Sequence, residues 1–266
     1  MVTKPRPKVR TRTLIQRKRK GERITMLTAY DALWSSMLDE AGIDVVLVGD
    51  SLGNVILGHR DTIPVTLDDM VHHTAAARRG VESALLVADM PFITARLSPD
   101  EALRNAARLV QEGGAEAVKI EGGREVCPAI AHIVESGIPV CGHLGLVPQS
   151  IHQLGGYRVQ GRESDAAERM RADADALVEA GVFAIVLELI PADLAGEITK
   201  RVPVPTIGIG AGPDCDGQVL VSHDLLGLGR DKPPSFVKEY AHLRQDAQRA
   251  VQAWLRDVLK GKFPER

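Results

Sequence analysis

The sequence predicts an α/β fold, an eight-stranded TIM (β/α)8 barrel, and three observations support this class. Eight short stretches rich in Val, Ile and Leu recur from residue 24 onward, helix-capping patterns separate them, and 266 residues suffice for one barrel. The expected strands are residues 24–29, 45–49, 84–88, 117–121, 138–143, 184–189, 205–210 and 218–222. An open doubly wound sheet is the alternative, because alternation alone does not close a barrel. No G-x-G-x-x-G motif follows the first strand, which weighs against dinucleotide binding.

Helix signals stand between the expected strands. Ser98 is placed to cap a helix that has Pro99 at its first position and Glu101 in its first turn. Residues 66–69 (TLDD) begin another helix in a similar way. Two Ala-Gly pairs are typical of helix ends, at residues 41–42 and 180–181.

Two connections are longer than a barrel requires, residues 51–65 and residues 144–163. Loops of this length on a compact scaffold are usually functional or disordered. The second connection contains residues 153–161 (QLGGYRVQG), whose glycine pair could hinge a lid. The sequence leaves open which of the two loops closes.

The composition is that of an ordinary soluble globular protein. Hydrophobic residues make up 44% and charged residues 26%, and no apolar run approaches membrane-spanning length. Cys127, Cys141 and Cys215 are odd in number and lack CxxC spacing, which fits neither a disulfide framework nor a thiolate zinc site. The beginning of the sequence also lacks the hydrophobic region of a signal peptide. We therefore expect a cytoplasmic protein with no membrane partner.

Positive charge is concentrated at the beginning of the chain. Residues 1–23 hold ten Lys or Arg and one acid, Glu22, whereas the rest of the chain has an excess of acid. We expect residues 1–23 to form a basic N-terminal arm, partly disordered and solvated, before a single barrel domain over residues 24–266. Such an arm could instead bind nucleic acid. Because aromatic residues make up only 3% and no nucleic-acid-binding motif follows the arm, we predict no nucleic-acid partner.

Polar residues gather at the ends of the expected strands, which form the active-site face of a TIM barrel. They are Asp50, Asp89, Lys119, Glu121, His143 and Glu188, on the second to sixth strands. A single carboxylate there could merely cap the following helix, and Lys119 with Glu121 could be a structural ion pair. Four carboxylates on neighbouring parallel strands, together with a lysine and a histidine, are much harder to explain structurally.

The alternation of side chains along a strand predicts which face each of these residues takes. Residues two apart share a face. Asp50 is therefore expected on the face of Val46 and Val48, and Glu188 on the face of Val186, toward the barrel axis.

Carboxylates crowded into one mouth repel one another, so a cation or a shared proton is expected among them. Asp50, Asp89 and Glu121 offer hard oxygen ligands, with no thiolate and one histidine nearby. This set favours Mg²⁺ over Zn²⁺, with Mn²⁺ or Co²⁺ as substitutes. A 2-oxo acid could chelate such an ion and become acidic at the neighbouring carbon. Glu188, if it is not a ligand, is then free to act as general base, and Lys119 to hold the substrate carboxylate.

Eight motifs occur in order along about residues 14–245 of the chain. They are MLTAYD (26–31), LVGDSLGNV (47–55), GH-x-x-T-x-PVTLDDM (58–70), KIEGG (119–123), GHLGL-x-PQS (142–150), LGGYRVQGR (154–162), GIGAGPDCDGQVLV (208–221) and FVKEYA (236–241). Their order and spacing resemble the ketopantoate hydroxymethyltransferase family, also called the 3-methyl-2-oxobutanoate hydroxymethyltransferases. The combination is far more specific than any single motif.

The resemblance implies a TIM barrel of the phosphoenolpyruvate-mutase-like group and a one-carbon transferase. The family transfers a hydroxymethyl unit from 5,10-methylenetetrahydrofolate to 3-methyl-2-oxobutanoate, which gives 2-dehydropantoate for pantothenate and coenzyme A synthesis. The resemblance also implies dependence on Mg²⁺ and a homodecamer built as a pentamer of dimers. Another Mg²⁺-dependent lyase or aldolase that acts on a 2-oxo acid with the same barrel is the nearest alternative.

The resemblance further implies roles for individual residues. Asp50, Asp89 and Glu121 would be the metal ligands, and Glu188 would be the proton acceptor. Contacts to the 2-oxo acid would come from Asp50, Ser51, Asp89 and Lys119, with His143 lining the same pocket. The sequence departs from the usual family pattern at residues 60–61 and 93–95, which concerns the rim and the folate contacts rather than the core chemistry.

Overall fold

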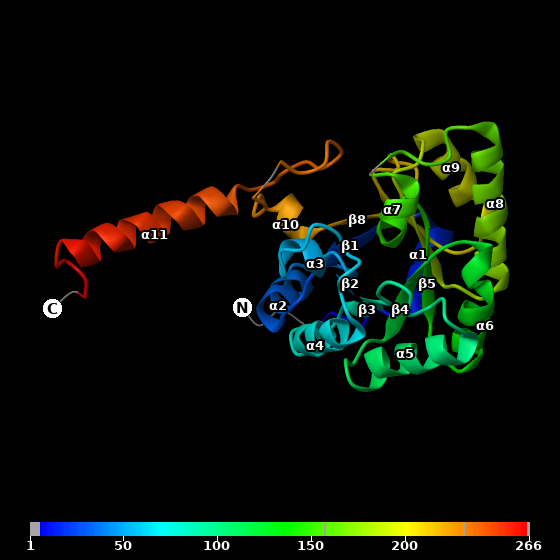
Figure 1. Cartoon of the computed structure of the whole chain (residues 1–266), viewed down its shortest axis with the longest axis horizontal. Coiled ribbons are helices and arrows are strands. Elements are labelled where there is room, and N and C mark those ends of the chain that lie inside the picture. The colour runs from blue at the N-terminus through cyan, green and yellow to red at the C-terminus, as the bar shows by residue number, and fades with distance from the viewer. Residues whose placement is uncertain (1–5, 157, 231, 265–266) are drawn as a thin grey trace. The chain divides into compact units, whose positions relative to one another are not determined.

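The computed structural model describes residues 6–156, 158–230 and 232–264, and its centre is a closed barrel of eight parallel strands (Figure 1). The strands follow one another around the barrel in chain order. They are β1 (Ile24–Thr28), β2 (Val45–Val48), β3 (Leu85–Asp89), β4 (Ala117–Glu121), β5 (Val140–Gly145), β6 (Ala184–Glu188), β7 (Thr206–Ile209) and β8 (Gly217–Leu220). The predicted TIM barrel is confirmed, and the open doubly wound sheet is excluded.

Each expected strand is present within two residues of its predicted bounds. The largest difference is in β5, which begins at Val140 and continues to Gly145. Pro139 precedes it, and proline lacks the N–H group that a central ladder position needs. The strand therefore begins after the proline and extends toward the barrel mouth.

Helices connect the strands, and Figure 1 shows α5, α6 and α8 outside the ring of strands. The helices between the strands are α2 (Ala32–Glu40), α3 (Leu52–Val55), α4 (Leu67–Arg78), α5 (Pro99–Gln111), η1 (Arg124–Val126), α6 (Cys127–Glu135), η2 (Pro148–Ser150), α7 (Ile151–Leu154), α8 (Ser164–Glu179) and α9 (Ala192–Arg201). Within the described ranges, no helix is both long enough and apolar enough to cross a membrane.

The predicted helix starts are confirmed by their caps. The N–H of Glu101 donates to Ser98 Oγ at 3.1 Å, with Pro99 in the first turn of α5. Thr66 and Asp69 exchange hydrogen bonds in a reciprocal capping box at the start of α4. These contacts satisfy N–H groups that have no partner inside the helix.

Apolar residues form two layers, one inside the barrel and one between the strands and the surrounding helices. The period of two along each strand sends alternate residues to the two layers. In β2, Val45 and Leu47 belong to the interior, and Val46 and Val48 to the outer layer. The inward series of each strand continues toward the barrel mouth, where the polar residues are.

The N-terminal segment closes the barrel at the end where the strands begin. Helix α1 (Thr11–Lys20) and the residues before it contribute Leu14 and Val9 to the interior apolar cluster. The N–H of Val9 donates to the carbonyl of Ser83, two residues before β3, at 2.7 Å.

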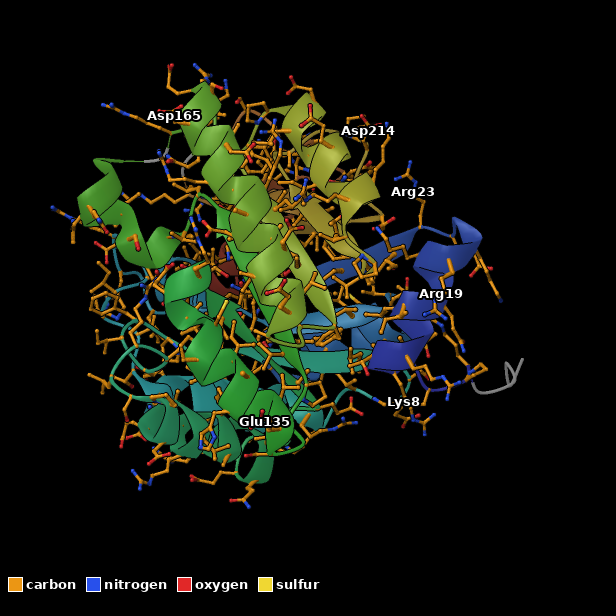
Figure 2. All side chains as sticks on the ribbon, turned by 90° about the vertical axis from the view of Figure 1, so that its right-hand side faces the viewer. Lys8, Arg19, Arg23, Glu135, Asp165 and Asp214 are labelled. Atoms are coloured by element: carbon orange, nitrogen blue, oxygen red, sulfur yellow. The ribbon has the colours of Figure 1, made fainter. Side chains whose placement is uncertain are left out.

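Bases of this segment form ion pairs with acids that directly precede three strands, β2, β4 and β8. The pairs are Arg6 and Arg17 with Asp44, Lys8 with Glu116, and Lys18 with Asp216. Figure 2 shows Lys8, Arg19 and Arg23 on this segment, at one side of the barrel.

The structure therefore differs from the expected basic arm over residues 6–23. The composition predicts a solvated segment, because ten bases in 23 residues repel one another when no acid is near. The three acids of the barrel lie far away in sequence and supply the compensating charge. Residues 1–5 lie outside the described part of the chain.

The expected single domain over residues 24–266 stays a prediction. Contacts separate the chain into two compact units, Met1–Val219 and Leu220–Arg266. The second unit contains α10 (Ser222–Leu225) and α11 (Leu243–Leu259). Within it, the N–H of Tyr240 donates to the carbonyl of Leu225 at 2.8 Å. Helix α11 has no buried side chain among its described residues.

Asp44→Ala should destabilise the folded chain by about 3–5 kcal/mol, the range expected when one partner of a buried ion pair is removed. The substitution leaves Arg6 and Arg17 without their shared carboxylate. The free energy of unfolding in urea measures the effect. Arg19→Ala is the control, at an exposed position of α1, the helix that also carries Arg17. It should change this free energy by less than about 0.5 kcal/mol. An Asp44→Ala protein as stable as the control would show that the ion pairs do not hold the segment.

Candidate active site

Seven side chains predicted from the sequence come together where β2 to β6 end. They are Asp50 and Ser51 after β2, Asp89 on β3, Lys119 and Glu121 on β4, His143 on β5 and Glu188 on β6. The strand register places Asp89 beside Lys119 and Glu121 beside His143. All except Ser51 and Glu188 are buried.

The alternation rule accounts for the inward direction of Glu188, because Val186 belongs to the interior cluster. The same rule holds for Lys119 and Glu121, which continue the inward series of Ala117 on β4. The charged pair in AVKIEGG is therefore directed into the barrel mouth.

The alternation rule is wrong for Asp50. Val46 and Val48, on its expected face, belong to the outer layer under the helices. However, β2 ends at Val48, and the turn through Gly49 brings the N–H of Asp50 within 3.0 Å of Asp89 Oδ2. A Cβ at Gly49 would lie 2.8 Å from Ser51 Oγ and 3.5 Å from Asp89 Oδ2, so a larger residue would displace the Ser51 hydroxyl.

Lys119 is the centre of the charged cluster. Its Nζ lies 3.2 Å from Asp89 Oδ1, 3.7 Å from Glu121 Oε1 and 3.1 Å from His143 Nδ1. Burial and three nearby carboxylates act in opposite directions on this ammonium. Burial lowers its pKa, but Asp89, Glu121 and Asp50 outweigh burial and raise the pKa above its ordinary value. The surrounding carboxylates therefore favour the charged form of Lys119.

His143 connects Glu121 to Glu188. Its Nδ1 lies 3.5 Å from Glu121 Oε1, and its Nε2 lies 3.2 Å from Glu188 Oε2. The contact between His143 and Glu188 is within ion-pair distance, but its geometry is not that of a hydrogen bond. Among the described residues, His143 Nε2 has no hydrogen-bond partner. Burial and the Lys119 charge oppose protonation of the ring, but the two carboxylates raise the pKa of His143 to about 9.

The three buried carboxyl groups differ in their pKa values. Burial, followed by the charges of Glu121 and Asp89, raises the pKa of Asp50 well above its ordinary value. Burial also raises the pKa of Asp89, although Lys119 opposes this. For Glu121, burial is again the largest influence, but Lys119 and His143 together lower the pKa. Mutual repulsion therefore concentrates at Asp50, where a cation would relieve it.

Tyr30 is a site residue that the sequence reasoning did not assign. Its hydroxyl donates to Thr28 Oγ1 at 2.9 Å and lies 2.9 Å from Ser51 Oγ. The side chain is fully buried and thereby fixes the position of Ser51. The available signal was its place in the MLTAYD motif, directly after the first strand.

Gln149, on η2, is the second residue that was missed. Its Nε2 donates to Asp50 Oδ2 at 2.8 Å and to the carbonyl of Met90 at 2.9 Å. Its backbone N–H donates to Glu121 Oε2 at 3.1 Å. The available signal was its place in the motif GHLGL-x-PQS, in the long loop after β5.

The backbone at Glu188 is tightly constrained. Its carbonyl accepts the N–H of Leu146 at 2.8 Å, and a Cβ at Gly145 would come within 2.1 Å of that carbonyl oxygen. Leu189, the next residue, has φ 45°, which is uncommon for a residue other than glycine. Such backbone conformations persist only where the surroundings enforce them and often occur at functional sites.

The two long loops approach each other at the mouth. His152 Nε2 in the second loop lies 4.0 Å from Asp61 Oδ2 in the first. Gly155 and Gly156 both have positive φ, at 68° and 119°. Tyr157, in the middle of the predicted lid segment, lies outside the described residues, and the lid stays a prediction.

The carboxylates are not spaced as a ligand cluster. Within the described ranges, no group of three or more His, Cys, Asp or Glu side chains is arranged to hold a metal ion. The ammonium of Lys119 and the amide of Gln149 lie among the acids instead.

The fold is similar to that of several solved barrel structures. Phosphonopyruvate hydrolase, in a complex with oxalate and Mg²⁺, matches with a TM-score of 0.63 and 15% identity over 97% of this chain and 89% of its own. 2,3-Dimethylmalate lyase, a member of the PEP mutase/isocitrate lyase superfamily, matches with a TM-score of 0.60 and 17% identity over 92% of this chain and 95% of its own. The predicted phosphoenolpyruvate-mutase-like barrel is thereby confirmed.

The sequence assigns the chain more narrowly. The family model for ketopantoate hydroxymethyltransferase matches residues 8–266, and the chain belongs to this family. The 3-methyl-2-oxobutanoate hydroxymethyltransferase of Moorella thermoacetica is 59% identical over 93% of this chain and 92% of its own length. The enzyme of that name from Syntrophus aciditrophicus is 52% identical over 97% and 95%. The resemblance and the enzyme class predicted from the motifs are confirmed.

Metal-free protein should lose stability between about pH 6.5 and pH 9, and His143→Gln should remove most of this loss. The folded-state pKa of His143, about 9, lies above the ordinary value of 6.5. The protonated ring therefore stabilises the fold fully below pH 6.5, and this contribution disappears as the pH rises through 9. A shift of this size corresponds to roughly 3 kcal/mol. The free energy of unfolding, measured in EDTA at both pH values, should fall less in the variant. Equal losses in wild type and variant would contradict the ion pairs of His143.

Proposed function

We propose that this enzyme transfers a hydroxymethyl unit from 5,10-methylenetetrahydrofolate to 3-methyl-2-oxobutanoate and so makes 2-dehydropantoate for pantothenate and coenzyme A biosynthesis. The observation that carries the proposal is the convergence of four carboxylates, an ammonium and an imidazole at the barrel mouth. The name that its relatives share supports the same reaction.

Asp50, Asp89 and Glu121 are the proposed ligands of Mg²⁺. Because these groups are not arranged around an ion in this structure, binding requires Asp89 and Glu121 to exchange the Lys119 ammonium for the ion. Their oxygens are hard ligands, and Asp89 Oδ1 is buried without a hydrogen-bond partner among the described residues. With Glu188, four carboxylates face two cations, so two negative charges remain uncompensated when all groups are ionised. A divalent cation would balance them. When bound there, the ion supplies Lewis-acid polarisation that makes C3 of the 2-oxo acid more acidic.

Lys119 is the proposed partner of the substrate carboxylate. Its raised pKa and its place beside Asp89 put a cation next to the proposed ligands. Ser51, held by Tyr30, and His143 offer further polar contacts to the oxo acid. Asp50 and Asp89 complete the substrate contacts that we propose.

Glu188 is the proposed general base that takes the proton from C3. Its side chain is 15% exposed, against 2–3% for Glu121 and Asp89, so a substrate can reach it from the mouth. Its ion-pair partner is His143 rather than Lys119 or Gln149. The imidazole of His143, 3.2 Å away, holds this carboxylate in position at the mouth.

Self-association and the absence of a nucleic-acid partner also stay proposals. Val251, Trp254 and Leu259 of α11 are 53–77% exposed, which favours burial against another copy of the chain. Bases of the N-terminal segment are already engaged with acids of the barrel, which removes the main argument for nucleic-acid binding. The homodecamer that the family resemblance implies is tested by light scattering after size-exclusion chromatography.

Removal of metal should abolish turnover, and added Mg²⁺ should restore it, because three converging carboxylates need a cation. Asp89→Asn removes one charge but keeps the size of the side chain, so the protein should fold and yet fail to recover activity with Mg²⁺. Turnover is followed as folate-dependent formation of 2-dehydropantoate. Full activity of a rigorously metal-free preparation would contradict this part of the proposal.

Glu188→Gln should bind Mg²⁺ and 3-methyl-2-oxobutanoate nearly normally but fail to exchange the C3 hydrogen with deuterated water. The amide keeps size and hydrogen bonding but cannot accept a proton, and a positioned general base contributes about 10²–10⁴-fold in rate. Exchange is followed by NMR, with Glu179→Gln at an exposed end of α8 as the matched control. Wild-type exchange in Glu188→Gln would exclude this residue as the base.

The same assay separates the proposal from a lyase or aldolase on the same barrel. Without 5,10-methylenetetrahydrofolate, the proposed enzyme exchanges the C3 hydrogen but forms no 2-dehydropantoate. Cleavage of a carbon–carbon bond in a 2-oxo acid without folate would support the alternative.

A further inference from the structure

Gln149 contacts all three strand ends that carry the proposed metal ligands. It lies in the loop after β5, and its side chain is buried. The amide Nε2 donates to Asp50 after β2 and to the carbonyl of Met90, the residue that follows β3. The backbone N–H donates to Glu121 at the end of β4.

These contacts fix one oxygen of each proposed ligand. Gln149 holds Oδ2 of Asp50 and Oε2 of Glu121, and the N–H of Asp50 holds Oδ2 of Asp89 at 3.0 Å. Glu121 and Asp89 each have a second oxygen that faces Lys119 Nζ. Glu121 Oε1 lies 3.7 Å from it and Asp89 Oδ1 lies 3.2 Å from it. Coordination through one oxygen per carboxylate suits Mg²⁺, whose small octahedral shell leaves little room for two.

The orientation of the Gln149 amide is determined by its neighbours. Both acceptors, Asp50 Oδ2 and the Met90 carbonyl, are oxygens, so the amide nitrogen must face them. Rotation of the amide would place its own oxygen against both acceptors. The side chain therefore has one favourable arrangement, which uses both of its N–H groups.

We propose that Gln149 is a positioning residue that fixes which oxygens of Asp50 and Glu121 are presented to Mg²⁺. This inference rests on the proposed function. Donors that orient metal ligands typically change metal affinity by about 10–100-fold when they are removed. A residue that only tied the loop to the barrel would change the stability of the protein and leave its metal affinity unchanged.

Isothermal titration of the metal-free protein with Mg²⁺, without either substrate, tests the inference. Gln149→Ala removes both side-chain donors, and Gln149→Met removes them while keeping length and packing. Both variants should bind Mg²⁺ about 10–100-fold more weakly than wild type at unchanged stoichiometry. Gln111→Ala, at an exposed glutamine that ends α5, is the matched control and should bind as wild type does. Thermal melting shows whether each variant is folded.

Steady-state kinetics give a second measurement. If Gln149 acts through the ligands, the Mg²⁺ concentration for half-maximal rate rises by the same factor as the dissociation constant, and turnover at saturating Mg²⁺ recovers to within a few-fold. The inference is overturned if both variants are folded and bind Mg²⁺ as tightly as wild type. If Gln149→Ala is unfolded, the result for Gln149→Met decides.

Asp50→Asn separates this failure from failure of the proposed function. If Asp50→Asn weakens Mg²⁺ binding while the Gln149 variants do not, only the inference fails. If Asp50→Asn binds Mg²⁺ as wild type does, the proposed metal site fails and the role of Gln149 fails with it.

Discussion

The buried ammonium of Lys119 is the interaction on which the active site depends. An ion taken out of water costs several kcal/mol even after the surroundings relax, and only well-placed opposite charges offset that cost. Asp89 and Glu121 supply them at 3.2 and 3.7 Å, from the neighbouring strand and from two residues along the same strand. The parallel register of β3, β4 and β5 therefore holds together charges that would otherwise repel one another or be solvated.

The two ends of the barrel meet the same electrostatic requirement in different ways. At the end where the strands begin, acids pair with arginines and lysines that come from the first 20 residues, and the pairs close the apolar interior. At the opposite end, four carboxylates face only two cations, and the excess of negative charge is what makes the mouth a candidate site for a metal ion and a 2-oxo acid. Stability and reactivity are thus placed at opposite ends of the strands, as the TIM barrel allows.

The sequence predicts most of what depends on local pattern. Each strand could be placed within two residues, because β-branched runs and capping residues such as Ser98 are local signals. The inward direction of Glu188 follows from alternation along β6. Asp50 lies past the end of its strand, so alternation no longer applies, and the turn at Gly49 decides its direction instead.

What the sequence does not predict depends on contacts between distant residues. The composition of the N-terminal segment predicts a solvated arm, because Asp44, Glu116 and Asp216 are remote in sequence from the bases that they pair with. Gln149 likewise sits in a loop, and only the closed barrel brings it 2.8 Å from Asp50. A structure of the protein crystallised with Mg²⁺ and 3-methyl-2-oxobutanoate tests the central claim most directly. We expect the ion bound to single oxygens of Asp50, Asp89 and Glu121, with Lys119 turned to the substrate carboxylate and Glu188 next to C3. An ion bound elsewhere, with Lys119 still between Asp89 and Glu121, would contradict it.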